Sequence, residues 1–396
     1  MSRFAHLCLD DDDKLLPPVE DILSGRESPF GMGKDSKENS WEALNDASDH
    51  KPYPRGLVNR SNFCYLNAVL QPLLLCQPFI NVILNMADSI QSSDGCKWLS
   101  AFLQIISAFV EPEGGEGTTR FRNTVSPEAI YQCWDHSDDQ EDAEEFLRLI
   151  LNGLHEELLK HKDQLGWSLP LSNQQDSDKQ KVDDEWMSIG KGKKRLAKTR
   201  SLTEPSSPIS VLFYGQFKTV ISGSGKKDSH IFEPFQILPV DITNENINTL
   251  QQAIESLSCK EKVDGKTHRQ LLIDRLPPVL IIQLKRFVFD PKTMHISKSL
   301  KPIEIPHEMD LGDIVHSWAD LLYFKSNERP KYRLYDIVYH LGRTIHGGHY
   351  TCHVYHDEGW LFCDDGAVQR APREVVGQMD RNRTPYLLFY ARVKEE

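Results

Sequence analysis

The amino-acid sequence predicts an α+β domain, because segments with helical periodicity come first and strand-like segments come last. Apolar residues recur at helical spacing near 62–75, 98–110 and 140–160, whereas the chain after about 210 is rich in β-branched and aromatic runs. No internal repeat interrupts this order. Helices followed by strands, rather than alternating with them, favour an antiparallel sheet with the helices gathered beside it.

Length and composition are those of a soluble globular protein. The 396 residues carry 46 Lys and Arg against 58 Asp and Glu, which gives a formal net charge of −12. This balance does not favour nucleic acid as a partner, and no stretch of about 18 apolar residues predicts a membrane span. No signal peptide is visible, so we expect a location in the cytoplasm or the nucleus. The oligomeric state stays undefined.

Composition divides the chain into segments. Residues 1–50 are polar and acidic, and we expect them not to fold alone. Residues 51–396 form the predicted folded domain. It carries a charged, low-complexity insertion at about 162–208, which we expect to be a loop or a disordered segment.

The helical segments have recognisable ends. Asn62 is a plausible N-cap for the first helix, which places Cys64 in its first turn. Pro72 removes a hydrogen bond inside that helix, so the helix is expected to end or kink there. For the third helix, Ser137 and Gln140 have the spacing of a capping box.

The strand-like segments are bounded by turn residues and together predict the sheet. Each is rich in residues that suit a pleated surface. They lie at 211–221, 232–242, 277–289, 332–341, 349–356, 360–365 and 386–393.

Cys64 is the first candidate for chemistry. A cysteine in the first turn of a helix meets unpaired N–H groups and the helix dipole, and such a site can lower a thiol pKa from about 8.5 to below neutrality. Most lone cysteines at such positions are small buried residues without chemistry, and this interpretation applies to Cys76, Cys96, Cys133 and Cys259. Cys64 is a nucleophile only if a base reaches it.

His349 is the candidate base. Gly347 and Gly348 precede it, in a loop where another backbone or a substrate can approach closely. With a turn at 357–359, the hairpin pairs residues whose numbers sum to roughly 716, which places Asp364 and Asp365 about 5 Å from His349. A carboxylate beside an imidazole completes a nucleophile, base and orienting group.

A metal site is the alternative for this region. His349, Cys352 and His353 lie close in the sequence, but on a strand the cysteine faces away from the two histidines. No known zinc spacing results, and the eight cysteines contain no C-x-x-C pair. The sequence therefore predicts neither a metal nor another cofactor.

Four ordered motifs resemble those of the ubiquitin-specific proteases. These are "GLVNRSNFCYLN" (56–67), "QEDAEEF" (140–146), "LPPVLIIQLKRF" (276–287) and "GGHYTCHV…WLFCDD" (347–365), and "YLLFY" (386–390) matches the closing strand of the family. The resemblance covers roughly 54–393. Two further stretches, 150–157 and 183–190, point to one subgroup of the family.

The resemblance implies a papain-like cysteine protease hand, with a helical thumb and β-rich fingers and palm. Cys64 would attack the carbonyl of the terminal glycine of ubiquitin, and His349 would move the protons. Asp364 would orient His349, with Asp365 as the alternative, and Asn59 would donate to the oxyanion.

The resemblance also implies a ubiquitin site. Gly347 and Gly348 would flank the channel for the Gly-Gly end of ubiquitin. Asp142 and Glu145, which we expect on the face of the third helix that points away from the core, would pair with arginines of the ubiquitin tail.

The fingers depart from a common pattern of the family, in which two C-x-x-C pairs bind zinc. Here Cys259 stands alone near the expected fingertips, so we predict fingers without zinc. The expected partners are ubiquitin and ubiquitinated proteins. Two alternatives stay open: an inactive ubiquitin-binding scaffold that keeps the fold, and an isopeptidase for a ubiquitin-like modifier.

Overall fold

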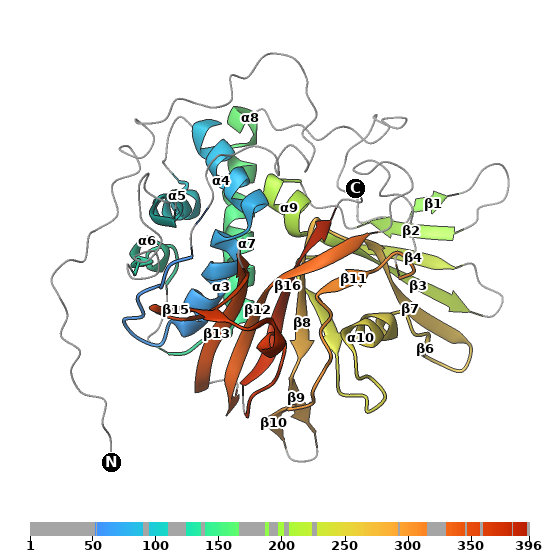
Figure 1. Cartoon of the computed structure of the whole chain (residues 1–396). Coiled ribbons are helices and arrows are strands. Elements are labelled where there is room, and N and C mark those ends of the chain that lie inside the picture. Colours follow the sequence, from blue (N-terminus) through green and yellow to red (C-terminus); the bar gives the residue numbers. More distant parts are fainter. Residues whose placement is uncertain are drawn as a thin grey trace.

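A computed structural model gives the structure of the chain (Figure 1). The structure describes residues 52, 54–89, 95–109, 124–135, 139–165, 187–189, 197–201, 206–223, 228–291, 294–314, 330–344, 347–356, 359–381 and 383–393. The N-terminal segment 1–50, predicted not to fold alone, lies outside these residues. In the described part helices precede the large sheet along the chain, which confirms the predicted α+β class.

The helices form one layer beside the large sheet (Figure 1). Apart from the short helix Lys162–Leu165, their apolar faces share one core with one face of that sheet, and aromatic contacts join them, such as Tyr65 against Phe146 with ring centroids 5.4 Å apart. They are α3 (Cys64–Leu74), α4 (Gln77–Ser89), α5 (Lys97–Phe109), α6 (Glu128–Tyr131), α7 (Ala143–Lys160), α8 (Lys162–Leu165) and α9 (Pro208–Phe213). The short α10 (Leu250–Leu257) packs on the other face, and a 3-10 helix covers Arg373–Val375.

Helix α3 is buried along its whole length and includes Pro72. The helix continues for two residues beyond this proline and ends at Leu74, close to the predicted end. The chain then bends by 85° into α4. Among the described residues no single helix is long and apolar enough to cross a membrane, and α3 and α4 meet the criterion only as a bent pair.

Helix α7 begins later than predicted. Its N-cap is Asp142, whose side chain accepts a hydrogen bond from the N–H of Glu144 at 2.7 Å. The predicted capping box of Ser137 and Gln140 is therefore wrong for this helix: Gln140 precedes the N-cap, and Ser137 lies outside the described residues. An aspartate is a favourable N-cap, and Asp142 lies directly before the first residue of the apolar stripe.

The large sheet has eight strands in the order β15-β14-β13-β12-β16-β8-β5, and β11 pairs with β12. Its pairs are antiparallel except β5 with β8. The strands are β5 (Leu238–Asp241), β8 (Val279–Lys285), β11 (Glu308–Asp310), β12 (Lys331–Thr344), β13 (Gly347–His356), β14 (Gly359–Asp364), β15 (Ala367–Ala371) and β16 (Arg383–Val393). The sheet is buried on both faces, so β12 alternates between the helix-side core at Val338 and the opposite core at Ile337 and Tyr339.

A second sheet of six strands extends to one side of the large sheet (Figure 1), in the order β1-β2-β4-β3-β7-β6. Its strands are β1 (Met187–Ile189), β2 (Ala197–Ser201), β3 (Gly215–Gly223), β4 (Ser229–Phe235), β6 (Glu261–Lys262) and β7 (Thr267–Arg275). Strands β1 and β2 lie inside the segment 162–208, so the expectation of a segment without regular structure is wrong for them. Their residues gain backbone partners because β2 pairs with the edge of β4.

Three predicted strands are interrupted. The expected strand 232–242 is divided between β4, which ends at Phe235, and β5, which begins at Leu238 in the other sheet. The expected strand 211–221 begins only at Gly215, because Ser207 caps α9 in a capping box and α9 extends to Phe213. The expected strand 277–289 is divided at Arg286 into β8 and β9 (Phe287–Asp290), and β9 forms a hairpin with β10 (His295–Lys298). Arg286 is buried and donates to the main-chain oxygens of Pro385, Ser299 and Lys301.

Candidate active site

Cys64 is the first residue of α3, at the positive end of the helix. Asn59 closes the turn that leads into the helix, because its Oδ1 accepts hydrogen bonds from the N–H groups of Ser61 and Phe63, both at 3.2 Å. The N-cap is Phe63 and not the predicted Asn62. Cys64 is 4% exposed, and the positive end of the helix dipole at this position favours an anion.

His349 faces Cys64 from the large sheet and is held by an aspartate. Strands β13 and β14 form the predicted hairpin in a register one residue from the expected one, since Cys352 pairs with Cys363. His349 Nε2 and Asp364 Oδ1 are 2.6 Å apart. Hydrogen bonds with Asp364 and with Cys64 raise the pKa of His349 to about 10. At neutral pH the imidazole is therefore a cation beside the sulfur, the environment in which a cysteine reacts as a thiolate.

Asp365 occupies a different position from its neighbour Asp364. Its Oδ2 accepts from Asn59 Nδ2 at 2.9 Å, and its Oδ1 accepts from Asn67 Nδ2 at 2.8 Å. Its main-chain oxygen accepts from the N–H of Leu57 at 2.9 Å. Asp365 thus ties the turn after β14 to α3 and to the segment before it. One hydrogen of the Asn59 amide points to Asp365, which leaves the second as a donor for another oxygen.

Gln140 belongs to the site, although its sequence position suggested only a capping role. Its Nε2 donates to Cys64 Sγ at 3.6 Å, and its Oε1 accepts from the N–H of Gly348 at 2.8 Å. The side chain therefore bridges the nucleophile and the residue before His349. The signal that could have identified it is its place as the first residue of the quoted "QEDAEEF" motif.

The two glycines before His349 differ in their surroundings. A Cβ on Gly348 would lie 2.2 Å from the main-chain oxygen of Leu341 and 2.6 Å from His340 Nε2, so a side chain there requires a shift of the backbone. A Cβ on Gly347 would meet only Thr344 Oγ1, at 3.3 Å. The close backbone approach predicted for this pair is thus present at Gly348, where the approaching strand is β12.

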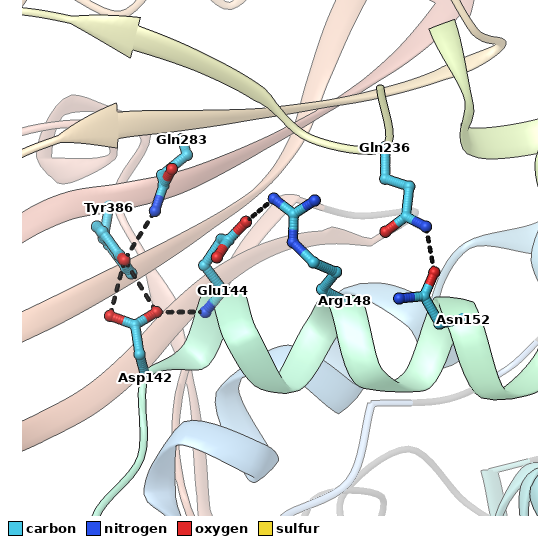
Figure 2. A network of polar contacts seen from close by, with 7 residues as sticks. All are labelled: Asp142, Glu144, Arg148, Asn152, Gln236, Gln283 and Tyr386. Atoms are coloured by element: carbon cyan, nitrogen blue, oxygen red, sulfur yellow. Dashed lines mark hydrogen bonds and ion pairs between the residues drawn. The ribbon is translucent and has the colours of Figure 1, made fainter. Parts of the chain in front are cut away.

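Asp142 does not point freely away from the core as predicted. Besides capping α7, it accepts hydrogen bonds from Tyr386 Oη at 2.9 and 2.8 Å, and Gln283 Nε2 donates to that hydroxyl at 3.0 Å (Figure 2). Burial raises the pKa of Asp142. Asp142 departs from the predicted orientation because it lies at the helix end, where its side chain turns back to the first N–H groups. Glu145, in contrast, is exposed as predicted.

Further polar contacts continue along the face of α7 that looks toward the strands (Figure 2). Glu144 pairs with Arg148, and Asn152 accepts from Gln236. Tyr214 Oη donates to Asn152 Oδ1 at 3.4 Å. The boundary between the helices and the strands is therefore polar along α7, whereas the opposite face of the helix is packed in the core.

Potential metal ligands gather in one place within the described residues. Atoms of His349, Asp364 and Asp365 lie within 4.8 Å of one another, but the structure already pairs them with each other and with Asn59 and other amides. His353, the other histidine weighed for a metal, contacts the Tyr339 hydroxyl instead. At the tips of the second sheet, the residues do not fit a zinc site of cysteine pairs, because Cys259 is exposed and has no cysteine beside it in the sequence.

Comparison with known proteins covers most of the described residues. The family described as "Ubiquitin carboxyl-terminal hydrolase" matches residues 55–390. Ubiquitin carboxyl-terminal hydrolase 10 of Xenopus tropicalis is 33% identical over 393 residues, which cover 87% of this chain and 48% of that protein. The probable ubiquitin carboxyl-terminal hydrolase 3 of Schizosaccharomyces pombe is 31% identical over 393 residues, with 86% of this chain and 74% of that protein covered.

The chain thus spans about half the length of the vertebrate relatives it matches. The subgroup predicted from 150–157 and 183–190 is that of hydrolase 10, and these relatives confirm it. Among solved structures, the Ubp8/Sgf11/Sus1/Sgf73 module of SAGA bound to ubiquitin aldehyde has a TM-score of 0.63 at 22% identity and covers 88% of this chain and 72% of that chain. This likeness confirms the predicted hand: the helices are the thumb, the large sheet the palm and the second sheet the fingers.

Proposed function

Since the chain belongs to the ubiquitin carboxyl-terminal hydrolase family, we propose that it is a cysteine-type deubiquitinase. It hydrolyses the peptide or isopeptide bond after the C-terminal glycine of ubiquitin, on proteins or on chains. The observation that carries the proposal is the placement of His349, whose Nε2 lies 2.6 Å from Asp364 Oδ1 and whose pKa is raised by both Asp364 and Cys64. This is the arrangement of a thiol protease.

The geometry supports a reaction in two halves. The Cys64 thiolate attacks the glycine carbonyl, and Asn59 donates its second amide hydrogen to the oxygen that becomes negative. The tetrahedral intermediate collapses to a thioester as His349 gives its proton to the departing lysine amine. Water then attacks the thioester, His349 takes a proton from it, and ubiquitin leaves with a free carboxylate while the thiolate is restored.

The tail of ubiquitin would approach between the start of α7 and the start of β13. Gly348 has no room for a side chain, and we infer that the Gly-Gly end of the tail lies against this narrow segment. Glu145 is exposed and available to a tail arginine. Asp142 is held by Tyr386 and by its own helix, so it presents a fixed acceptor at the same end of α7.

The test is hydrolysis of a ubiquitin fused to a fluorophore at its C-terminus. We expect turnover by the intact chain and a loss of about 10³-fold or more in Cys64→Ala, which removes the nucleophile. The matched control is Cys259→Ala, which removes an exposed thiol elsewhere and should keep the full rate. An inactive intact chain that binds ubiquitin would support a scaffold, and cleavage of a ubiquitin-like modifier alone would replace ubiquitin as the substrate.

A further inference from the structure

A half-buried lysine lies beside the glycine segment of the site, Gly347 and Gly348. Lys298, the last residue of β10, directs its Nζ to three acceptors on β12: His340 Nδ1 at 2.8 Å, the main-chain oxygen of His340 at 2.8 Å and that of Gly342 at 3.0 Å. Burial and the neighbouring Arg286 lower the pKa of Lys298 to about 8. The contact links the β9–β10 hairpin to the strand that leads to the catalytic histidine.

Lys298 determines which ring nitrogen of His340 carries the proton. An ammonium group only donates hydrogen bonds, so Nδ1 of the imidazole must accept, and the ring proton lies on Nε2. His340 is fully buried, and its ring packs edge to face against Phe287 and Tyr350, with centroids 5.3 and 4.9 Å away. Burial and the charge of Lys298 lower the pKa of His340 to about 3, so the ring stays neutral.

The protonated edge of His340 lies against Gly348. A Cβ on this glycine would be 2.6 Å from His340 Nε2, and that nitrogen has no hydrogen-bond partner among the described residues. On the other side, the N–H of Gly348 donates to Gln140, which also contacts Cys64. Gly348 is therefore fixed between the imidazole and Gln140.

We propose that Lys298 and His340 are positioning residues for the reaction, because together they support Gly348 and so set the distance between His349 and Cys64. The proposal rests on the proposed function for its substrate, but the positioning itself does not require ubiquitin. The neutral imidazole of His340 also has an electrostatic effect on His349. A cation at His340 would repel the imidazolium of His349, whereas the lysine keeps the ring uncharged.

A role in packing alone is the competing explanation, and a matched pair of variants separates the two. Lys298→Met removes the ammonium group and keeps nearly the length of the side chain. Tyr339→Phe, in the same strand, removes a buried hydroxyl that contacts His353 and accepts from the N–H of Gly377, without touching the glycine segment. Both changes should lower the melting temperature.

The readouts are kcat and KM for the ubiquitin fluorophore substrate, and the pH profile of Cys64 alkylation by iodoacetamide. We expect Lys298→Met to lower kcat about tenfold or more with a smaller change in KM, and to slow alkylation near neutral pH. Tyr339→Phe should keep kcat within about twofold. If both variants keep the kcat and the alkylation profile of the intact chain and lose only stability, Lys298 acts through packing and the proposal is overturned.

Two further measurements separate a failure of the positioning proposal from misfolding of the variant and from a failure of the proposed function. If Lys298→Met does not fold, imidazole NMR of the intact chain should show His340 as the neutral Nε2–H form between about pH 5 and pH 7, the range in which Lys298 is still an ammonium. Titration in that range or a proton on Nδ1 would refute the proposal. If the intact chain fails to cleave ubiquitin while Lys298→Met still changes the alkylation profile, the proposed function fails and the positioning role stands.

Discussion

Asp365 provides a sharp test of how the oxyanion donor is held. The change is Asp365→Asn, which keeps the shape of the side chain and suits the positive φ of 47° at this position. The carboxylate accepts from Asn59 and from Asn67, whereas an amide offers one oxygen and turns an NH₂ group toward the second donor. At least one of the two ties is lost. Where it is the tie to Asn59, the NH₂ end of that amide loses its partner and only the bonds from Ser61 and Phe63 to its Oδ1 remain.

The magnitude follows from what the donor contributes. Removal of one oxyanion donor costs about 10²–10³ in kcat, so Asn59→Ala should lose that much. Asp365→Asn leaves the donor present but poorly placed, so we expect a loss of about 10- to 100-fold in kcat. Because Asp365 acts through Asn59, the double variant should be within about threefold of Asn59→Ala alone.

The assay is a double-mutant cycle on the ubiquitin fluorophore substrate, with kcat measured at saturation. The melting temperature of each variant shows how much protein is folded, so that a loss of folding is not read as a loss of catalysis. Full additivity of the two losses would refute the reasoning, because two residues that act independently do not share one function.

Two other predictions concern carboxylates. Asp364→Asn removes the main support of the His349 cation. The raised pKa of His349 keeps the imidazolium fully formed below about pH 6.5, and the charge is lost as pH rises through about 10. In the variant that loss should begin at a lower pH, so the fall of activity on the alkaline side should shift to lower pH in a series of kcat/KM measurements. Asp336→Val should stabilise the protein by about 1–3 kcal/mol, because Asp336 is fully buried and neither carboxyl oxygen has a hydrogen-bond partner among the described residues. Burial raises the pKa of Asp336, so the folded state keeps the proton and the gain should grow as pH rises above about 4, whereas Asp336→Asn, which cannot ionise, should show a smaller gain. Thermal unfolding at several pH values measures both, and a clear destabilisation by Asp336→Val near neutral pH would mean that the carboxyl has a partner.

The parts of the site that local sequence determines were predictable. A cysteine after turn residues begins a helix, and a hairpin turn brings a histidine opposite an aspartate that follows it by 15 residues. The sequence could not separate Asp364 from Asp365 on register alone, because a hairpin register inferred from sequence is uncertain by about a residue. The structure separates them by the different partners that each contacts.

The failures have a common physical origin in contacts between distant segments. Gln140 was read as a local cap, but its partners are Cys64 and Gly348, on two other elements. Asn59 does the local work assigned to Asn62, because a side chain that accepts from two following N–H groups defines the turn before the cap. Such pairings depend on how α3, α7 and β13 pack, and the spacing within a motif does not reveal them.

The catalytic groups come from both halves of the hand, and this determines how the site can lose its alignment. Cys64 and Asn59 belong to the thumb side, whereas His349 and Asp364 belong to the palm. In the described part of the chain, three residues make polar ties that cross between them near the chemistry: Asp365 holds the thumb side from the palm, Gln140 holds Gly348 from the thumb side, and Asp142 at the start of α7 accepts from Tyr386 of the palm. A change in the palm that moves the turn after β14 therefore reaches the oxyanion donor before it reaches the nucleophile, which α3 anchors in the core. We expect such changes to lower kcat while iodoacetamide still reacts with Cys64, because alkylation does not need the oxyanion donor.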